Sequence, residues 1–241
     1  MVDDREARGA AATSEKMLRA AAELLRTGGV NALSTRAVAA AAGVQPPTIY
    51  RQFGDKDGLL DAVAHFAVKS YLHTKRRMLN ASGNPVDLLR QLWDLNVDFG
   101  LKNPDAYMLA YANPRPGKTA AAAAETTAML HEAIARIAEQ GRLGMGVERA
   151  VRLVQAAGIG LVVTTLAVPP GQRDDRLSEI AKENMLRAIL SDNRTRSSKP
   201  SKLPARAVAL AEALRSADTI DLTTAESALL TEWLDRLADS A

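Results

Sequence analysis

Apolar residues recur at helical spacing in every long stretch between the glycine and proline breaks of this chain, and this pattern constrains the fold most. In the first stretch Met17, Ala21, Leu24 and Leu25 follow one another at intervals typical of one helix face, and Gly28 ends the pattern. Later helices are expected near residues 85–102, 104–112, 119–140, 147–168, 174–191, 205–216 and 224–238. No stretch shows a strand pattern. The sequence therefore predicts an all-α fold.

The composition agrees with this prediction and excludes several kinds of site. Hydrophobic residues make up 47% of the chain and charged residues 24%, which is typical of a soluble globular protein. Only 4% of the residues are aromatic, and the abundant Ala and Leu both favour helices. The chain has no Cys, which rules out disulfides, thiolate metal sites and a thiol nucleophile.

Charge and hydropathy indicate where the protein works and what it meets. The charged segment 2–8 does not resemble a signal peptide, and the longest apolar run, 156–168, is shorter than a membrane span of roughly 20 residues. We therefore expect a cytoplasmic protein with no membrane partner. The net charge is only +3, but residues 1–77 hold 12 Lys and Arg against 8 Asp and Glu, and residues 78–241 hold 19 against 20. A polyanion is therefore expected to meet the N-terminal third.

Two short helices joined by a tight turn form the most informative pattern in the chain, within residues 34–60. The first is expected to begin near Ser34 and to end at Gly43, a residue type that tolerates the left-handed conformation of a helix C-terminus. Pro46 and Pro47 can open the second, and Pro47 is expected to be its first helical residue because a residue before proline disfavours helical angles. With a helix before them, the two describe a helix-turn-helix unit, which binds DNA.

The second short helix is predicted to have one buried face and one free face. Ile49 and Phe53 are four residues apart and can pack on the preceding helices. The opposite face carries Thr48, Arg51, Gln52 and Asp55. Arg can bridge two acceptors of guanine, Gln can bridge adenine, and Thr can contact a thymine methyl group, so this chemistry suits a major groove. The alternative interpretation is a short solvated helix in an all-α bundle.

Two neighbouring runs carry a more specific pattern, LSTRAVA at residues 33–39 and GVQPPTIYRQFGDKDGLL at residues 43–60. They combine a Thr that opens a helix, a Gly-Val turn, a Thr-Ile-Tyr core, a Phe after it and a Lys shortly before Leu-Leu. This pattern resembles the N-terminal domain of the TetR (tetracycline repressor) family. The resemblance covers roughly the first quarter of the chain and otherwise extends only to the number and order of helices. It implies a homodimeric regulator, usually a repressor, whose C-terminal helices bind a small molecule.

The resemblance also implies DNA-binding roles for eight residues. Thr35 and Arg36 are expected to hold a phosphate at a helix N-terminus. Tyr50 and Lys56 are expected to contact the DNA backbone as well. The residues expected to face bases are Pro47, Thr48, Arg51 and Gln52. Proline at both positions 46 and 47, and Arg at position 51, depart from the usual family pattern, and the prolines remove two amides that could meet phosphates.

A regulator of this kind couples DNA binding to a second site, which we expect in a cavity among the helices between residues 85 and 168. Candidate ligand contacts are Trp93, Phe99, Tyr107, Met108, Tyr111, His131 and Thr164. Each of them has an alternative interpretation as part of the hydrophobic core. Because this stretch has no cluster of charges, a mostly apolar or neutral ligand is favoured.

The helices near 147–168 and 174–191 are expected to form a homodimer interface, by analogy with the resembled family. Their apolar residues are Val151, Val154, Ile159, Val162, Val163, Leu166, Ile180, Met185, Ile189 and Leu190. A two-fold dimer doubles the base contacts and predicts a palindromic double-stranded operator. The predicted organisation is a flexible lead at 1–12, a DNA-binding domain at 13–62, a ligand-binding and dimerisation domain at 63–192, a linker at 193–204 and a helical extension at 205–241.

No motif indicates catalysis, a metal or a cofactor. His65, His73 and His131 do not form the four-residue pair of a helical metal site, and the chain has no nucleophile elbow, phosphate-binding loop or dinucleotide fingerprint. The basic run 75–77 could contact the DNA backbone, or it could be a solvated face. The leading hypothesis is a dimeric repressor that a small, mostly apolar ligand releases from its operator. The alternatives are an activator, a ligand-independent DNA-binding protein and an all-α enzyme.

Overall fold

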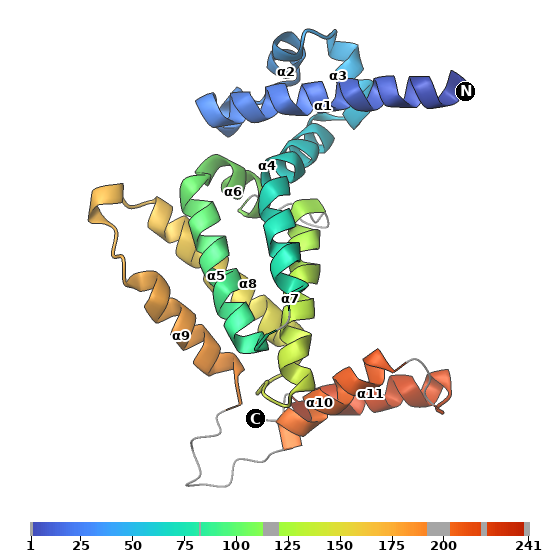
Figure 1. Ribbon diagram of the computed structural model, residues 1–241, viewed down its shortest axis with the longest axis vertical. Helices are drawn as coiled ribbons and strands as arrows, with labels where there is room; N and C mark the ends of the chain where they lie inside the picture. The colour runs from blue at the N-terminus through green and yellow to red at the C-terminus, as the bar shows by residue number, and fades with distance from the viewer. Residues whose placement is uncertain (1, 82, 113–120, 192–202, 218–220, 239–241) are drawn as a thin grey trace. The chain divides into compact units, whose positions relative to one another are not determined.

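The computed structural model describes residues 2–81, 83–112, 121–191, 203–217 and 221–238, and within them every regular element is a helix (Figure 1). The elements are α1 (Val2–Gly28), η1 (Val30–Ala32), α2 (Thr35–Ala42), α3 (Pro46–Phe53), α4 (Lys56–Leu79), α5 (Pro85–Lys102), α6 (Pro104–Tyr111), α7 (Ala121–Glu139), α8 (Val147–Leu166), η2 (Pro170–Gln172), α9 (Leu177–Ile189), α10 (Leu203–Ser216) and α11 (Thr224–Ala238). The only strand-like pairing among these residues is an isolated bridge between Leu143 and Leu190. The predicted all-α fold is confirmed.

Helix α1 begins earlier than the sequence pattern predicts. We expected a flexible lead over residues 1–12, whereas α1 runs from Val2 to Gly28. Residues 2–12 contain no proline and four alanines, and alanine is the residue that favours a helix most. The predicted linker at 193–204 lies mostly outside the described residues, and α10 begins at Leu203.

The chain divides into two compact units. One comprises Met1–Thr74 with Asp98–Thr126, and the other comprises Lys75–Val97 with Thr127–Ala241. The boundaries fall inside α4, α5 and α7, so each of these helices contributes residues to both units. The functional boundary predicted between residues 62 and 63 stays a prediction.

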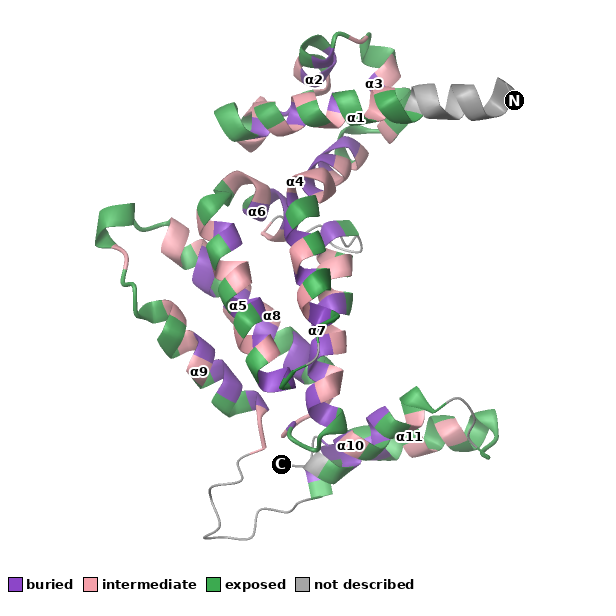
Figure 2. Ribbon diagram, viewed as in Figure 1, coloured by how far each residue is buried: buried purple, intermediate pink, exposed green. Residues whose placement is uncertain are grey.

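The unit that contains α1 to α3 has a small core built from one face of each helix (Figure 2). Helix α1 packs against α2 and α6, and α2 packs against α3. The core residues of these helices and of the first turns of α4 are Met17, Ala21, Leu25, Leu33, Val38, Ala39, Ala42, Ile49, Leu59 and Val63, all of which are at most 3% exposed. This core holds the two short helices of the helix-turn-helix in one fixed geometry.

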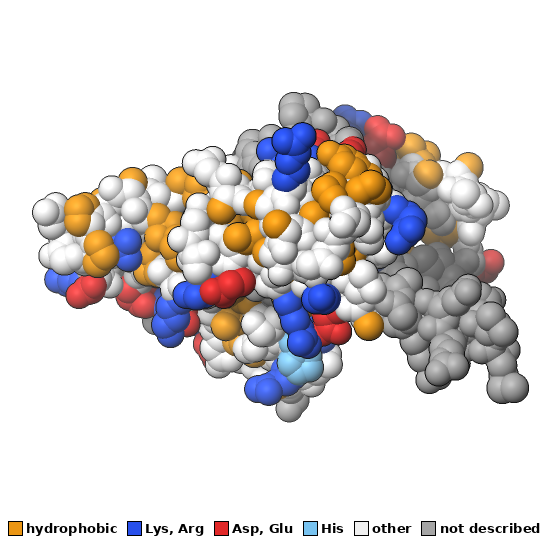
Figure 3. Space-filling model, turned by 90° about the horizontal axis from the view of Figure 1, so that it is seen from above, with side chains coloured by type: hydrophobic (Ala, Val, Ile, Leu, Met, Phe, Trp, Pro, Cys, Tyr) orange, Lys and Arg blue, Asp and Glu red, His pale blue; other side chains and the backbone are white. Residues whose placement is uncertain are grey.

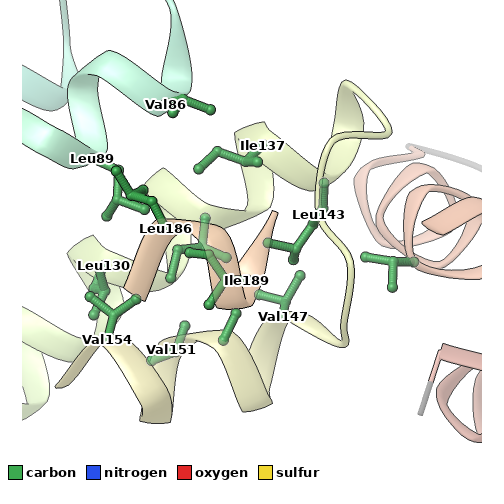
Figure 4. Close-up of a cluster of buried hydrophobic side chains, with 14 of the residues drawn as sticks. Val86, Leu89, Leu130, Ile137, Leu143, Val147, Val151, Val154, Leu186 and Ile189 are labelled. Carbon is green, nitrogen blue, oxygen red and sulfur yellow. The ribbon is translucent and has the colours of Figure 1, made fainter. Parts of the chain in front are cut away.

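The other unit has a larger core in which α5, α7, α8 and α9 meet (Figure 4). Side chains from these four helices, such as Leu89, Ile137, Val151 and Ile189, form one buried cluster. The hairpin of α10 and α11 contributes to the same cluster, with Val208 among its buried residues. The C-terminal extension is therefore part of this core.

Helix α8 is the one described helix that is long and apolar enough to cross a membrane by length and composition alone. Its buried face, which includes Val147, Val151 and Val154, belongs to the core of the second unit. The core helix of a globular protein meets the same criteria, so they are weak evidence that α8 spans a membrane.

Candidate nucleic-acid interface

Helix α2 has a well-defined start and end. The Ser34 hydroxyl accepts a hydrogen bond from the Ala37 amide at 3.1 Å, which satisfies one of the free donors at the helix N-terminus. Gly43 ends the helix with φ of 63°, in the left-handed region that favours glycine. Both features match the sequence prediction, and they leave only Val44 and Gln45 between Gly43 and the first residue of α3.

Helix α3 begins at Pro46, one residue before the predicted start at Pro47, with Gln45 as its extended N-cap residue. Both prolines fit because the first helical amides have no acceptor within the helix. The only N–H among the first three residues of α3 belongs to Thr48, and it donates to the Gln45 carbonyl at 2.9 Å. These three residues therefore offer no free amide to a phosphate, and contacts at this point must come from side chains.

The two faces of α3 are arranged as predicted. Ile49 is fully buried and Phe53 is half-buried, so this side of the helix packs on the core. Arg51 and Gln52 are exposed and Thr48 is half-buried, which leaves a polar face open to a ligand. This geometry matches a recognition helix, whereas the specific base contacts of these side chains stay predictions.

The junction between α3 and α4 is rigid. The Asp55 carboxylate accepts a hydrogen bond from the Gly58 amide at 2.7 Å and so caps α4, which corrects its assignment to the free polar face of α3. A Cβ at Gly58 would lie 2.1 Å from the Phe53 carbonyl oxygen, so only glycine fits there without a backbone shift. Lys56, the first residue of α4, is exposed beside this junction.

A contact between two hydroxyl groups links α2 to α3. The hydroxyl oxygens of Thr35 and Tyr50 are 3.3 Å apart, although the residues lie at the start of α2 and within α3. Tyr50 is 52% exposed, and Arg36 next to Thr35 is also exposed. These side chains form one polar group at the N-terminus of α2, where the helix dipole favours an anion.

Lys16 of α1 is a cation near this surface that the sequence pattern did not single out. Its ammonium nitrogen lies 3.6 Å from the position that a Cβ on Gly43 would occupy, so it reaches the turn between α2 and α3. Arg19 and Arg26 on the same helix form ion pairs with Glu15 and Glu23. The relevant signal, a Lys next to the buried Met17, becomes meaningful only once the packing of α1 on α2 is known.

The charged side chains on the molecular surface lie in small separate groups. Figure 3 shows Lys and Arg side chains in separate groups among neutral and hydrophobic ones. This distribution agrees with the net charge of +3 over the whole chain. Among the described residues on this face, Lys and Arg side chains do not merge into one broad basic surface.

Residues 17–63, which include all of α2 and α3, match the family model described as bacterial regulatory proteins of the tetR family. The N-terminal domain of this chain is therefore a TetR-type DNA-binding domain. The match covers the helix-turn-helix and the first turns of α4, so the chain is a DNA-binding transcriptional regulator. No curated protein matches it in sequence.

Solved structures resemble this chain over most of their own length. A TetR-family regulator from Haemophilus influenzae is 21% identical with a TM-score of 0.53, and covers 75% of this chain and 98% of its own. A putative TetR-family regulator from Vibrio parahaemolyticus is 25% identical with a TM-score of 0.51, at 75% and 99% coverage. NalD, the secondary repressor of the MexAB-OprM multidrug efflux pump in Pseudomonas aeruginosa, is 24% identical with a TM-score of 0.51, at 77% and 99% coverage. About a quarter of this chain therefore has no counterpart in these three structures.

Three of the predicted ligand contacts lie in one aromatic cluster. The Phe99 ring stacks on Tyr71 at 4.5 Å and lies 6.4 Å from the Tyr107 ring, and Tyr107 lies 5.0 Å from Tyr111. The Tyr111 hydroxyl is 3.0 Å from the Thr126 hydroxyl, and burial raises the pKa of Tyr111. Tyr71 was missed because nothing in its spacing on α4 sets it apart from a core residue.

The other candidates have separate positions. Met108 is 36% exposed, and Thr164 is exposed on α8 with its hydroxyl donating to the Gly160 carbonyl at 2.7 Å. The buried Trp93 donates to the Ser178 hydroxyl at 3.2 Å, and His131 lies 3.1 Å from Glu148. Four candidates, Phe99, Tyr107, Met108 and Tyr111, belong to one unit, and three, Trp93, His131 and Thr164, belong to the other. A pocket in the second unit, between the α4–α5 connection and α7, is lined by none of them.

Half of the residues predicted to form the dimer interface are buried inside the single chain. Val151, Val154, Val162, Met185 and Ile189 are at most 7% exposed in a single chain, so these five cannot meet a partner. The prediction assigned them to the interface because the sequence does not show which face of each helix the other helices of the chain cover. The exposed large hydrophobic residues of this region are Leu153, Val168, Leu177 and Ile180.

The basic run 75–77, which the sequence suggested as a contact to the DNA backbone or as a solvated face, is not uniformly exposed. Lys75 is 4% exposed, and burial lowers its pKa to about 8. Arg76 forms an ion pair with Glu132 at 2.9 Å. In the part of the chain that the structure describes, no group of three or more His, Asp and Glu side chains is placed to hold a metal.

Proposed function

We propose that this TetR-family protein is a homodimeric cytoplasmic repressor that binds a palindromic operator and leaves it when a small, mostly apolar ligand binds. The observation that carries the proposal is the polar face of α3. Arg51 and Gln52 are exposed on a short helix whose other face is fixed by the buried Ile49. A recognition helix needs this combination of free hydrogen-bonding side chains and a rigid support.

Anchoring on phosphates is assigned to side chains around α3. Thr35, Arg36 and Tyr50 lie at the N-terminus of α2, and Lys56 begins α4. Because the first three residues of α3 offer no free amide, these side chains position the helix in the groove. Pro47 and Thr48 at the start of α3 complete the set that faces bases.

A dimer through α8 and α9 is supported by the outward faces of these helices. Leu153, Leu177 and Ile180 are 38%, 42% and 51% exposed, and Val168 lies in the segment between the two helices. One short α3 makes few base contacts, so two copies on half-sites about one DNA turn apart are needed for tight binding. Ile180→Glu should therefore yield monomers with greatly reduced operator affinity, which sedimentation and gel-shift measurements would show.

The ligand site is assigned to the aromatic cluster, which holds the predicted contacts Phe99, Tyr107 and Tyr111, with Met108 on the same helix as the two tyrosines. Rings packed at 4.5 to 6.4 Å suit a ligand with apolar or aromatic groups. Release requires that the ligand bind better to the state with misplaced recognition helices, since equal affinity for both states shifts nothing. That NalD is a repressor supports the direction of control.

The proposal is tested by transcription and by release. A reporter behind the operator should be silenced by the protein and restored by an inducer from a panel of small apolar compounds. Fluorescence anisotropy of the operator complex then measures release, and a tenfold loss of DNA affinity implies a coupling of about 1.4 kcal/mol and a tenfold weaker ligand affinity on DNA. Activation of the reporter would contradict the repressor assignment, and lasting retention of DNA with every compound would contradict ligand release.

A further inference from the structure

The last helix carries an apolar stripe that its own chain leaves exposed. In α11, Leu229, Trp233 and Leu237 recur every four residues and so lie on one face. Their exposed fractions are 45%, 52% and 37%. Large side chains exposed in a row are characteristic of a surface that binds another protein.

The stripe is rigidly mounted. On the adjoining face of α11, Leu234 and Ala238 are buried in the core cluster that α8 and α9 also share, and α10 packs along the hairpin. Six of the twelve large hydrophobic residues exposed in the described structure lie on or beside α10 and α11, namely Leu203, Leu210, Leu222, Leu229, Trp233 and Leu237. The exposed side chains of α11 therefore lie on a helix that is anchored in the core, so they form a preformed surface.

An acidic and a basic residue flank the stripe, and in an antiparallel pair of helices each would face the opposite charge of the other copy. Glu232 and Arg236 are exposed on the same edge of the stripe, one turn apart. If two copies of α11 pair in antiparallel orientation about a point near residue 234, Glu232 of each copy lies beside Arg236 of the other. The same pairing brings Leu229 of one copy next to Leu237 of the other, and the two Trp233 side chains meet near the two-fold axis.

We propose that α11 is a second self-association surface, through which two copies of this protein pair in antiparallel orientation with Trp233 at the centre. The stripe and the α8–α9 face lie apart, since α9 and α11 are on opposite sides of their unit in Figure 1. An α11 contact therefore joins two α8–α9 dimers into a tetramer. This role rests on the proposed α8–α9 dimer, but the α11 pairing itself does not require it.

The size of the stripe sets the strength of the contact. Its three half-exposed side chains offer roughly 250 to 300 Å² per copy, against about 800 Å² per partner in a standard stable interface. The tetramer should therefore be weak in free solution and form readily when two dimers are held close together, for instance on neighbouring operators. The surface thus gives the regulator a way to link occupied DNA sites.

Single-cysteine cross-linking tests the pairing directly, because the chain has no native Cys. In the full-length protein, Trp233→Cys should form a disulfide-linked pair on mild oxidation, since only positions near the two-fold axis bring the two sulfur atoms within bonding distance. Ala228→Cys, an exposed position on the far side of α11, is the matched control and should stay unlinked. Equal cross-linking of both variants, or of neither, would overturn the proposal.

Charge reversal gives a second test that does not depend on removing Trp233. Sedimentation over a concentration series should show dimers assembling into tetramers, and Glu232→Arg or Arg236→Glu should weaken this step roughly two- to tenfold. The double variant with both charges exchanged should restore it, because the pairs re-form in reversed order. A double variant no better than the single variants would contradict the antiparallel pairing.

The outcomes separate this inference from the proposed function. In an Ile180→Glu background, the Trp233→Cys cross-link should persist, since α11 pairing does not need the α8–α9 contact. In that background, loss of operator binding with a retained cross-link is the expected result. Intact operator binding would count against the α8–α9 dimer as the DNA-binding form, whereas loss of the cross-link would count against the α11 pairing alone.

Discussion

Replacing Lys56 tests whether the start of α4 contacts the DNA backbone. Lys56 is exposed beside the capped junction of α3 and α4, and Lys56→Gln removes one positive charge from each copy without touching the core. Each phosphate contact contributes about 0.9 to the slope of log affinity against log salt, so a dimer should lose about 1.8 in slope. The ratio of wild-type to variant affinity should then shrink about tenfold between roughly 50 and 200 mM salt.

The matched control is Lys69→Gln. Lys69 is exposed on the same helix, 13 residues further along, which is about 20 Å at the rise of an α-helix and well beyond the Debye length of about 10 Å. Anisotropy titrations at four or five salt concentrations, on the operator and on random DNA, give the slopes of the wild type and of both variants. Equal slopes for wild type and Lys56→Gln, or an equal loss in both variants, would refute a specific phosphate contact.

Three further predictions address base recognition, the α3–α4 junction and a buried cation. Arg51→Ala should lose roughly 1 to 3 kcal/mol of discrimination at one base pair of each half-site, seen by titrating operator variants, and a uniform loss across all variants would make Arg51 a backbone contact. Gly58→Ala should lower both the melting temperature and the operator affinity, with a cost of roughly 1 to 3 kcal/mol, because its Cβ would meet the Phe53 carbonyl; an unchanged melting curve would refute this. Burial lowers the pKa of Lys75 to about 8, below its ordinary value of 10.5, so the unfolded state binds the proton more tightly and stability should rise with pH between these values. Lys75→Met should abolish that rise, as denaturant unfolding at pH 7 and pH 10 would show, and a persisting rise would contradict the assignment.

The helix-turn-helix could be predicted in detail because its signals are local. The cap at Ser34 and the left-handed Gly43 each depend on a few neighbouring residues, and both occur where the sequence indicates. The faces of α3 follow from helical periodicity, with Ile49 buried and Arg51 exposed. Asp55 was assigned to the wrong role because its helical phase continues α3, whereas its carboxylate caps α4.

The second half of the chain could be predicted only as a set of helices. Periodicity places Thr164 and Val162 on α8, but it does not say which face the other helices cover, and Thr164 is exposed while Val162 is buried. Lys75 is a cation that only the tertiary packing places inside the protein. The start of α1 at Val2 was missed because helix-favouring residues without an apolar stripe give no periodic signal.

Selection of bound sequences from a random DNA pool tests the central claim, that two copies of α3 recognise a symmetric operator, most directly. The account predicts enrichment of a palindrome whose half-sites are about one helical turn, roughly 34 to 36 Å, apart. Within each half-site, the position most sensitive to Arg51→Ala should be a guanine. Enrichment of an asymmetric site, or binding to all sequences with equal affinity, would contradict the account.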